Sequence, residues 1–507
     1  MTSQTDRRVD LLVVGGGING AGIARDAAGR GFNVLLCDKG DLGSATSSAS
    51  SKLSHGGLRY LEHFEFRLVR EALAEREVLL RIAPHIGRPL RFVLPLDASL
   101  RPAWMIAVGL FLYDHLARRS RLGSSRRLDL HMTQEGMPLK REITKGFSYF
   151  DGWIDDSRLV VLNAMDAAAR GAAILPRWTC QKILRQRDCY VAQLAESGGQ
   201  RMSVSARAVV NAAGPWAGRV LNRITGDRDP LRLVKGSHII VPKLYDGDHA
   251  YILQNDDKRI VFTIPYEDRF TVIGTTDVSF TGEADRVEIS ADEIDYLCAA
   301  VNRWFQRPLR PDAIISTYSG VRPLIDDEKS DPSAVTRDYI FDLRGGEKEP
   351  ILLSIFGGKL TTYRPLAEAA VGKLARFFPK MSAPWTANAP LPGGDIPNAD
   401  IDAFESAFKR DHPWLEPQIA ERYVRLYGNR TAILLNGARS MSELGRHFGS
   451  GLHEREVEYL IAHEWAETAE DILWRRTKIG LHISPDGVAA LTDWLRRRSP
   501  RVNAAAS

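Results

Sequence analysis

Three glycines and one aspartate near the N-terminus have the types and spacing of a dinucleotide site. Gly15, Gly17 and Gly20 form a G-x-G-x-x-G pattern between an apolar run and a stretch of helix-forming composition. Glycine lets the backbone approach a pyrophosphate, and the N-terminus of the following helix stabilises its negative charge. Asp38 closes a second apolar run, where a carboxylate can bind a ribose hydroxyl. The pattern predicts dinucleotide binding; the alternative is a glycine-rich turn that binds nothing.

The stretch after Asp38 indicates which dinucleotide. "GDLGSATSSASSKLSHGGLRYLE" (40–62) is rich in small and polar residues and reads as a loop. A nicotinamide-dependent enzyme would continue with regular β-α repeats, whereas this composition suits a backbone that lies along an extended FAD. The FAD contacts expected in this loop are Ser47, Ser51, Lys52, Ser54, Gly56 and Gly57.

Two later segments repeat the change from an apolar strand to glycine. They are "ARAVVNAAGPWA" (206–217) and "ILLSIFGGKLTTYR" (351–364), the second with a helix start expected at Thr361 and Thr362. The cofactor contacts expected in these segments are Gly214, Gly357, Gly358, Lys359, Leu360 and Thr361. Three such elements, far apart in the chain, predict a cofactor domain interrupted by insertions.

These elements predict an α/β chain with a discontinuous, Rossmann-like FAD-binding domain at 1–70, 150–225 and 345–385. A mixed α+β substrate-binding or cap domain is expected at 71–149 and 226–344. A linker rich in proline and glycine (386–402) then leads into segments with aromatic and leucine residues at helical spacing, so a helical C-terminal domain is expected at 386–507.

Composition excludes several other classes of protein. Hydrophobic residues make up 44% and charged residues 26%, as in ordinary globular proteins, and a net charge of +5 is too small for a nucleic-acid-binding composition. The four cysteines form no C-x-x-C pair, which favours a reducing compartment without a disulfide framework or metal site. "HEWAE" (463–467) lacks the second histidine of a zinc motif and is expected on an exposed helix face. No signal peptide is expected.

Together the motifs resemble those of the FAD-dependent glycerol-3-phosphate dehydrogenases. The resemblance begins with residues 11–62 and covers nearly the whole chain. It continues in order through "VNAAGPWA", "KGSHIIVP", "IGTTDV", "SGVRPL", "GGKLTTYR" and "EDILWRRTKIGL". It implies oxidation of sn-glycerol 3-phosphate to dihydroxyacetone phosphate, with FAD as cofactor and quinone at a membrane surface as acceptor. A cytoplasmic enzyme on the inner face of the membrane is therefore expected, and a homodimer stays open.

A phosphate dianion as substrate would need fixed cations, and the arginine fork suits phosphate oxygens. The resemblance points to Arg59, Arg322, Arg337 and Lys359; the alternative for each is a solvated surface charge. Tyr60 is expected to contact substrate or to pack on the flavin.

A base must remove the proton of the C2 hydroxyl while hydride leaves C2, and histidine titrates close to the working pH. His238 is the first candidate, because it opens an apolar strand where an unpaired histidine is costly. His55, in the flavin loop, is the second. The alternative for both is a hydrogen-bonded structural histidine.

Residues 101–130 combine an apolar run with arginines at 118, 119, 121, 126 and 127, and "WLRRRSPR" (494–501) is also basic. Basic residues near an anionic leaflet contribute about 1 kcal/mol each, so these segments could hold the enzyme on a membrane. The run at 104–113 is too short to span a bilayer. The alternative is a buried helix followed by solvated arginines.

Two other functions remain open. A flavin oxidase could pass electrons to oxygen, with glycerol 3-phosphate or an amino acid as substrate. A flavin-binding protein without turnover is the alternative from another class, although the arginines and histidines of the expected site argue against it.

Overall fold

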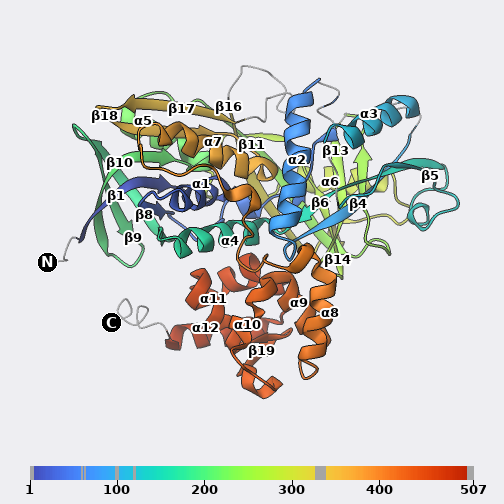
Figure 1. Cartoon of the computed structure of the whole chain (residues 1–507). Coiled ribbons are helices and arrows are strands. Elements are labelled where there is room, and N and C mark those ends of the chain that lie inside the picture. Colours follow the sequence, from blue (N-terminus) through green and yellow to red (C-terminus); the bar gives the residue numbers. More distant parts are fainter. Residues whose placement is uncertain are drawn as a thin grey trace.

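The computed structural model describes residues 5–58, 61, 64–97, 102–117, 121–257, 259–325 and 339–498. Arg59, Tyr60 and Arg337 therefore lie outside the described residues, as do Arg118 and Arg119. Two β-sheet bodies stand side by side, and a group of helices from the C-terminal part packs against them (Figure 1).

The first body is an eight-stranded sheet with the path β17–β18–β10–β1–β2–β7, to which β9 and β8 add beside β10. Its strands are β1 (Thr5–Val14), β2 (Val34–Cys37), β7 (Ala173–Leu175), β8 (Trp178–Arg185), β9 (Tyr190–Glu196), β10 (Arg201–Asn211), β17 (Ile340–Gly346) and β18 (Glu349–Phe356). The five strands from β18 to β7 are parallel, so their carboxyl ends meet at one edge. This confirms the Rossmann-like fold class.

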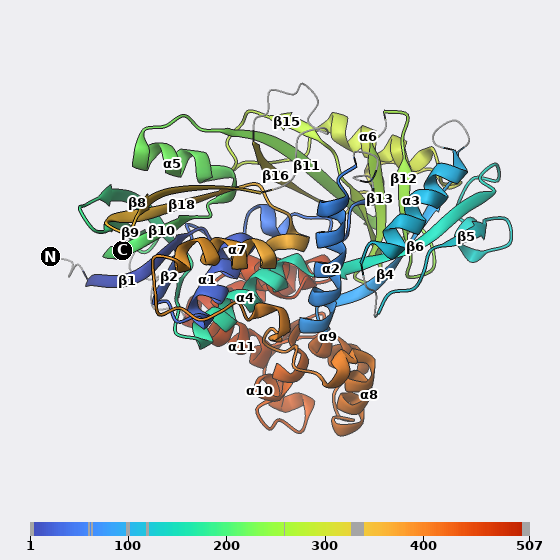
Figure 2. The same cartoon turned by 45° about the horizontal axis from the view of Figure 1, so that its top comes forward.

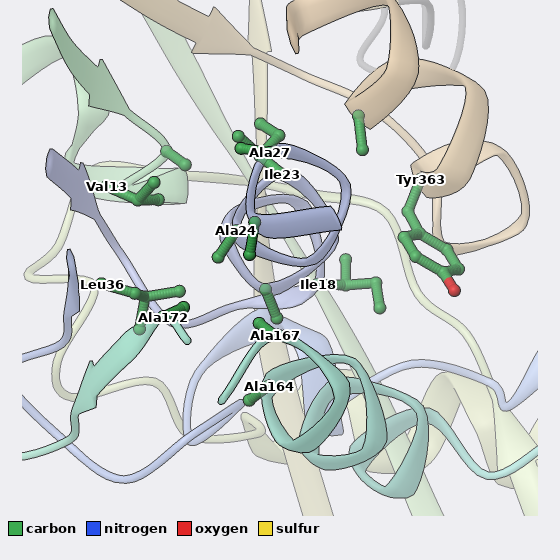
Figure 3. Close-up of a cluster of buried hydrophobic side chains, with 14 of the residues drawn as sticks. Val13, Ile18, Ile23, Ala24, Ala27, Leu36, Ala164, Ala167, Ala172 and Tyr363 are labelled. Carbon is green, nitrogen blue, oxygen red and sulfur yellow. The ribbon is translucent and has the colours of Figure 1, made fainter. Parts of the chain in front are cut away.

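Helices α1 (Ile18–Gly29), α4 (Asp156–Ala169) and α7 (Tyr363–Ala375) cover one face of this sheet. The other face packs against α5 (Ala217–Thr225) and the β8–β9 hairpin. Because both faces are buried, the strands read as continuous apolar runs. Figure 3 shows α1 between α4 and α7; a Cβ on Gly22 would come within 2.7 Å of the Tyr363 ring, so α1 and α7 pack unusually closely.

The second body is a ten-stranded, mainly antiparallel sheet built from two separate parts of the chain. Its strands are β3 (Leu53–Ser54), β4 (Gly87–Pro95), β5 (Arg126–Asp129), β6 (Lys145–Ile154), β11 (Leu231–Pro242), β12 (Ala250–Gln254), β13 (Ile260–Tyr266), β14 (Phe270–Gly274), β15 (Val278–Phe280) and β16 (Ser316–Ile325). Helices α2 (Phe66–Ile82) and α3 (Ala103–His115) pack on one face and α6 (Ala291–Asn302) on the other. The short β3 belongs to the polar loop after Asp38 and pairs with β6, which joins this loop to the second sheet.

The C-terminal part is mostly helical, as expected. Its elements are α8 (Ile401–Asp411), α9 (Pro417–Tyr427), α10 (Thr431–Leu435), α11 (Glu454–Glu464), a π-helical segment (Asp471–Arg476), α12 (Pro485–Arg498) and a small hairpin of β19 (His447–Gly449) and β20 (Leu452–His453). These elements share a core of their own. The expectation of an exposed "HEWAE" face is wrong at Glu464, which is fully buried against Arg158 of α4.

The sheets place some elements differently from the expected domain boundaries, which stay a prediction. β17 pairs in the first sheet although it begins before residue 345, and β6 extends past residue 150 while it belongs to the second sheet. Within the described part of the chain, none of the helices combines the length and apolar character that a bilayer-spanning segment needs.

Candidate functional site

The three strand-to-glycine elements come together, because β18, β10 and β1 are neighbours in the sheet. Gly15 has a φ of +113°, and a Cβ there would lie 2.4 Å from the carbonyl oxygen of Ala212, just before Gly214. The side chain of Asn19 on α1 donates to the carbonyl oxygen of Gly357 at 3.3 Å. The three glycine turns, which the sequence predicted separately, thus lie at the same edge of the first sheet.

The turn at the start of α1 has a shape that would let a pyrophosphate come close to the backbone. Gly17 caps the helix without a side-chain hydrogen bond, and a Cβ on Gly20 would lie 1.8 Å from the carbonyl oxygen of Gly15. The N–H of Ile18 donates to Ser47 Oγ at 3.0 Å, which brings the polar loop to the helix N-terminus. These features fit a pyrophosphate. Buried Asn19 Oδ1 is left without a hydrogen-bond partner in the described structure, as expected of an acceptor at a ligand site.

Asp38 ties this turn to the loop that follows β2. Its two carboxylate oxygens accept the N–H of Gly16 at 2.6 Å and the N–H of Gly40 at 2.7 Å. A contact from Asp38 to a ribose stays a prediction.

The other two turns also have the backbone freedom that a cofactor would use. Gly214 has a φ of +54°, and a Cβ there would meet no atom within 4 Å, so it faces open space. Gly357 and Gly358 have φ values of +76° and +97°. Half-buried Lys359 and Leu360 follow, and Thr361 Oγ1 accepts the N–H of His55 at 3.2 Å. The α7 helix begins at Tyr363, close to the expected start.

Lys52 stabilises the polar loop through a buried ion pair. It is buried with a φ of +57°, and its Nζ lies 2.8 Å from Asp156 Oδ1 at the start of α4. Burial alone would lower the pKa of Lys52, but Asp156, Tyr318 and Asp155 raise it, so this lysine is charged. Ser50 Oγ donates to the second oxygen of Asp156 at 2.7 Å. Lys52 therefore supports the loop, and its contact with FAD stays a prediction.

The rest of the loop is anchored to the second sheet. The N–H of Gly56 donates to the phenolic oxygen of Tyr113 at 2.8 Å, and this hydroxyl donates to buried Asp151 at 2.8 Å. Gly57, with a φ of +76°, lines a cavity described below. Ser54 Oγ is buried and finds no hydrogen-bond partner in the described residues.

His238 has the surroundings of a neutral proton acceptor. It is 2% exposed, and its ring stacks on Tyr318 with a centroid separation of 4.6 Å. Its Nε2 lies 2.8 Å from Ser51 Oγ, and its buried Nδ1 is left without a partner in the described structure. Burial, followed by the charges of Arg322 and Lys52, lowers the pKa of His238 well below 6.5. The ring is therefore neutral near pH 7, which is the state that a base needs, but it binds a proton less tightly than an ordinary histidine does.

Arg322 on β16 supplies a cation next to His238. Its guanidinium pairs with Asp277, and its Nη2 donates to Thr275 Oγ1 at 3.1 Å. Half-buried His55 lies with Thr275 and Asp277 on the wall of one cavity. The structure thus brings Arg322, His238 and His55 to the same region.

This cavity has a volume of about 640 Å³. Its polar wall contains His55, Asp151, Gln254, Thr275 and Asp277. Its other walls are apolar and come from the second sheet and from Met105, Val108 and Leu112 of α3, among others. A cavity whose wall combines polar and apolar side chains can hold a polar substrate or an apolar molecule.

Three supporting residues could not be found from the sequence: Asp156, Asp151 and Tyr113. Each binds a partner distant in the chain, so no local pattern marks it. The adjacent acids Asp155 and Asp156 before an apolar helix indicate where the helix begins, because such acids commonly cap helices, but they do not indicate the partner Lys52.

Known proteins resemble this chain over nearly its whole length. The family model "FAD dependent oxidoreductase" matches residues 10–364, and "C-terminal domain of alpha-glycerophosphate oxidase" matches residues 384–500. A glycerol-3-phosphate dehydrogenase of Pseudomonas aeruginosa is 54% identical over 98% of this chain and 97% of its own. A D-erythritol 1-phosphate dehydrogenase of Brucella abortus is 52% identical over 96% and 97%. The crystal structure of a glycerol-3-phosphate dehydrogenase from Bacillus halodurans complexed with FAD matches with a TM-score of 0.75 and 27% identity, covering 96% of this chain and 89% of that one.

Proposed function

Because the chain belongs to the family of FAD-dependent oxidoreductases, we propose that it oxidises sn-glycerol 3-phosphate to dihydroxyacetone phosphate and passes the electrons to quinone. FAD is its cofactor. The observation that carries the proposed chemistry is that neutral His238 lies near the cation Arg322, which pairs with Asp277 on the cavity wall. A glycerol-3-phosphate dehydrogenase with 54% identity over nearly the full length supports this choice of substrate.

Bound FAD supplies a two-electron acceptor for the hydride that leaves C2 of the substrate. His238 accepts the proton of the C2 hydroxyl, so the alcohol loses one hydride and one proton and becomes a ketone. Ser51 fixes the ring of His238 through its hydrogen bond to Nε2, and stacking on Tyr318 fixes the plane of the ring.

Arg322 and Lys359 would bind the phosphate, with Arg59 and Arg337 as proposed partners outside the described residues. Arg322 is already oriented by Asp277 and Thr275. A phosphate dianion carries more charge than the Asp277 carboxylate and matches the arginine fork, so it would compete for this guanidinium. Lys359, at the start of the turn before α7, would act as a point charge.

One experiment tests this function directly. The oxidised-flavin absorbance of the purified holoenzyme is followed without oxygen after sn-glycerol 3-phosphate is added. We expect rapid bleaching, because hydride transfer reduces the flavin. A yellow protein that stays oxidised would refute the substrate and leave the cofactor in place.

A second candidate substrate is D-erythritol 1-phosphate, the substrate in the name of a relative with 52% identity. It is a longer polyol phosphate, and the cavity of about 640 Å³ has room for further carbon atoms. The same bleaching assay compares the two substrates under identical conditions. Faster reduction per unit concentration by D-erythritol 1-phosphate would make it the preferred substrate.

The quinone is proposed from the apolar part of the cavity. Met105, Val108 and Leu112 of α3 line this part, and Trp104 and Phe111 of the same helix are 67% and 61% exposed. α3 is therefore not the buried helix of the alternative interpretation. Exposed apolar side chains beside an apolar opening suit a lipid surface from which a quinone enters.

Measuring how fast different electron acceptors reoxidise the flavin tests the proposal that quinone is the acceptor. A Val108→Trp substitution narrows the apolar part of the cavity. It should therefore slow reoxidation of the flavin by a quinone, while reoxidation by a small soluble dye stays unchanged. Equal reoxidation of both variants by quinone would refute this route. Rapid reoxidation by air, with hydrogen peroxide formed, would favour an oxidase.

A further inference from the structure

The segment Asp471–Lys478 of the C-terminal part contains three buried cations. Arg475, Arg476 and Lys478 are 9%, 0% and 4% exposed. Burying one charge costs several kcal/mol unless the charge is paired. A segment with three such cations is unusual for a surface domain, and the proposed chemistry does not use it.

Arg475 and Arg476 both bind the carboxylate of Asp41, which lies in the loop after β2 of the first sheet. Arg476 places Nη1 at 2.8 Å from Asp41 Oδ2 and Nη2 at 2.8 Å from Asp41 Oδ1. Arg475 adds its Nε at 2.6 Å from Asp41 Oδ2. Asp41 is itself buried. We call these three residues the Asp41 clamp.

The Asp41 clamp fixes the loop after β2, and this loop contacts the first glycine turn. Asp41 lies three residues after Asp38, which accepts the N–H of Gly16 at 2.6 Å. On the other side of Asp41, the N–H of Gly43 donates to the carbonyl oxygen of Gly16 at 3.0 Å. Both ends of the clamped loop therefore bind the turn that is shaped for the pyrophosphate.

Lys478 fixes the same segment at a second point. Its Nζ lies 2.8 Å from Asp155 Oδ1 and 2.6 Å from Ser157 Oγ, at the start of α4. The neighbouring Asp156 holds Lys52 of the polar loop. The clamp is thus built on a segment that cannot shift without disturbing α4.

We propose that Arg475 and Arg476 are positioning residues for FAD, which hold the pyrophosphate turn in shape through Asp41. The helical C-terminal part then completes the FAD site from outside the cofactor domain. A clamp that served only to join two domains would contribute to stability and leave FAD binding unchanged. The inference rests on FAD as the cofactor and does not depend on the proposed substrate.

The test measures FAD release from the holoenzyme. Wild type and the variants Arg476→Lys and Asp41→Asn are diluted, and the fluorescence of released FAD gives the dissociation rate. Arg422→Lys is the matched control, because Arg422 binds the buried carboxylate of Glu456 within the C-terminal part. Melting temperatures are measured for all four proteins.

We expect Arg476→Lys and Asp41→Asn to release FAD at least roughly tenfold faster than wild type, as for a typical coupling between two sites. Arg422→Lys should melt at a lower temperature yet release FAD at the wild-type rate. If the clamp variants lose stability as the control does and release FAD at the wild-type rate, the proposal is wrong. Should Arg476→Lys fail to fold, Asp41→Asn alone decides, because it keeps both arginines.

Discussion

At His238, burial and two neighbouring cations keep the pKa well below 6.5. A base works only when it is unprotonated, which is the case above its pKa. We therefore expect the rate of flavin reduction to stay flat from pH 6.5 to about pH 8 and to fall only in more acid solution. His238→Asn should lower this rate by roughly 10²–10⁴-fold while FAD stays bound.

Anaerobic stopped-flow measurements across pH check both statements. His131→Asn is the control, since His131 is an exposed histidine. A reduction rate that rises with a midpoint near neutral pH would show that another group is the base, and His55 would be tested next.

Arg322 gives a second prediction at this scale. Arg322→Lys keeps the charge and removes the fork, so the paired hydrogen bonds to phosphate cannot form. We expect KM for sn-glycerol 3-phosphate to rise by roughly tenfold or more, with a smaller change in kcat. Steady-state kinetics measure this, with exposed Arg310→Lys as the control. An unchanged KM would remove Arg322 from the phosphate site.

Single residues differed in how far the sequence could predict them. The glycine turns, His238 and Arg322 stand in motifs whose chemistry is distinctive; the structure brings the turns to one edge of the first sheet and places His238 near Arg322. Asp156 could not be predicted, because its partner Lys52 lies more than a hundred residues away. Ion pairs of this kind follow from the fold and leave no local pattern.

Elements were predictable where burial imposes a pattern. β1, β10 and β18 are buried on both faces and therefore read as apolar runs before glycine. The short strand β3 was not predictable, because it has only two residues and owes its conformation to pairing with β6. The apolar run at 104–113 allowed both a buried and a surface helix, and only the packing of α3 separates them.

The exposed face of α3 carries the element-scale prediction. Trp104 and Phe111 would enter the membrane interface, and burial of each contributes about 1.5–3 kcal/mol. Trp104→Gln together with Phe111→Gln should therefore lower binding to anionic vesicles at least tenfold. Flavin reduction by substrate should not change, because neither residue lines the cavity.

Co-sedimentation with vesicles at low salt measures this, and Met132→Gln with Met137→Gln is the matched control of exposed apolar residues outside α3. Equal binding of all variants would contradict a role of α3. Exposed Arg126 and Arg127 follow Ser125, whose N–H donates to Asp114 of α3 at 2.8 Å, whereas Arg121 binds the carbonyl oxygen of Ala399 at 3.0 Å.

At the scale of the whole molecule, the two basic segments lie in different parts of the fold. Figures 1 and 2 show α3 beside the strands of the second sheet, and Figure 1 shows α12 in the C-terminal part on the other side of the molecule. The exposed arginines of α12 therefore belong to a helix that is separated from α3. The sequence could show that both segments are basic, but their relative position depends on how three bodies pack.

The packing of the C-terminal part depends on buried charge, and this gives the last prediction. Arg158 on α4 and Glu464 on α11 are both 0% exposed, with Arg158 Nη2 at 2.9 Å from Glu464 Oε1. Removing one partner leaves the other charge buried and unpaired, so Arg158→Met or Glu464→Met alone should lower the free energy of unfolding by about 3–5 kcal/mol. The double variant removes both charges and fills the space with apolar atoms, so it should lose much less than the sum of the two. Urea unfolding followed by tryptophan fluorescence measures all four proteins of this cycle. Losses that simply add would show that the two side chains contribute independently, and the buried pair would then not join the bodies.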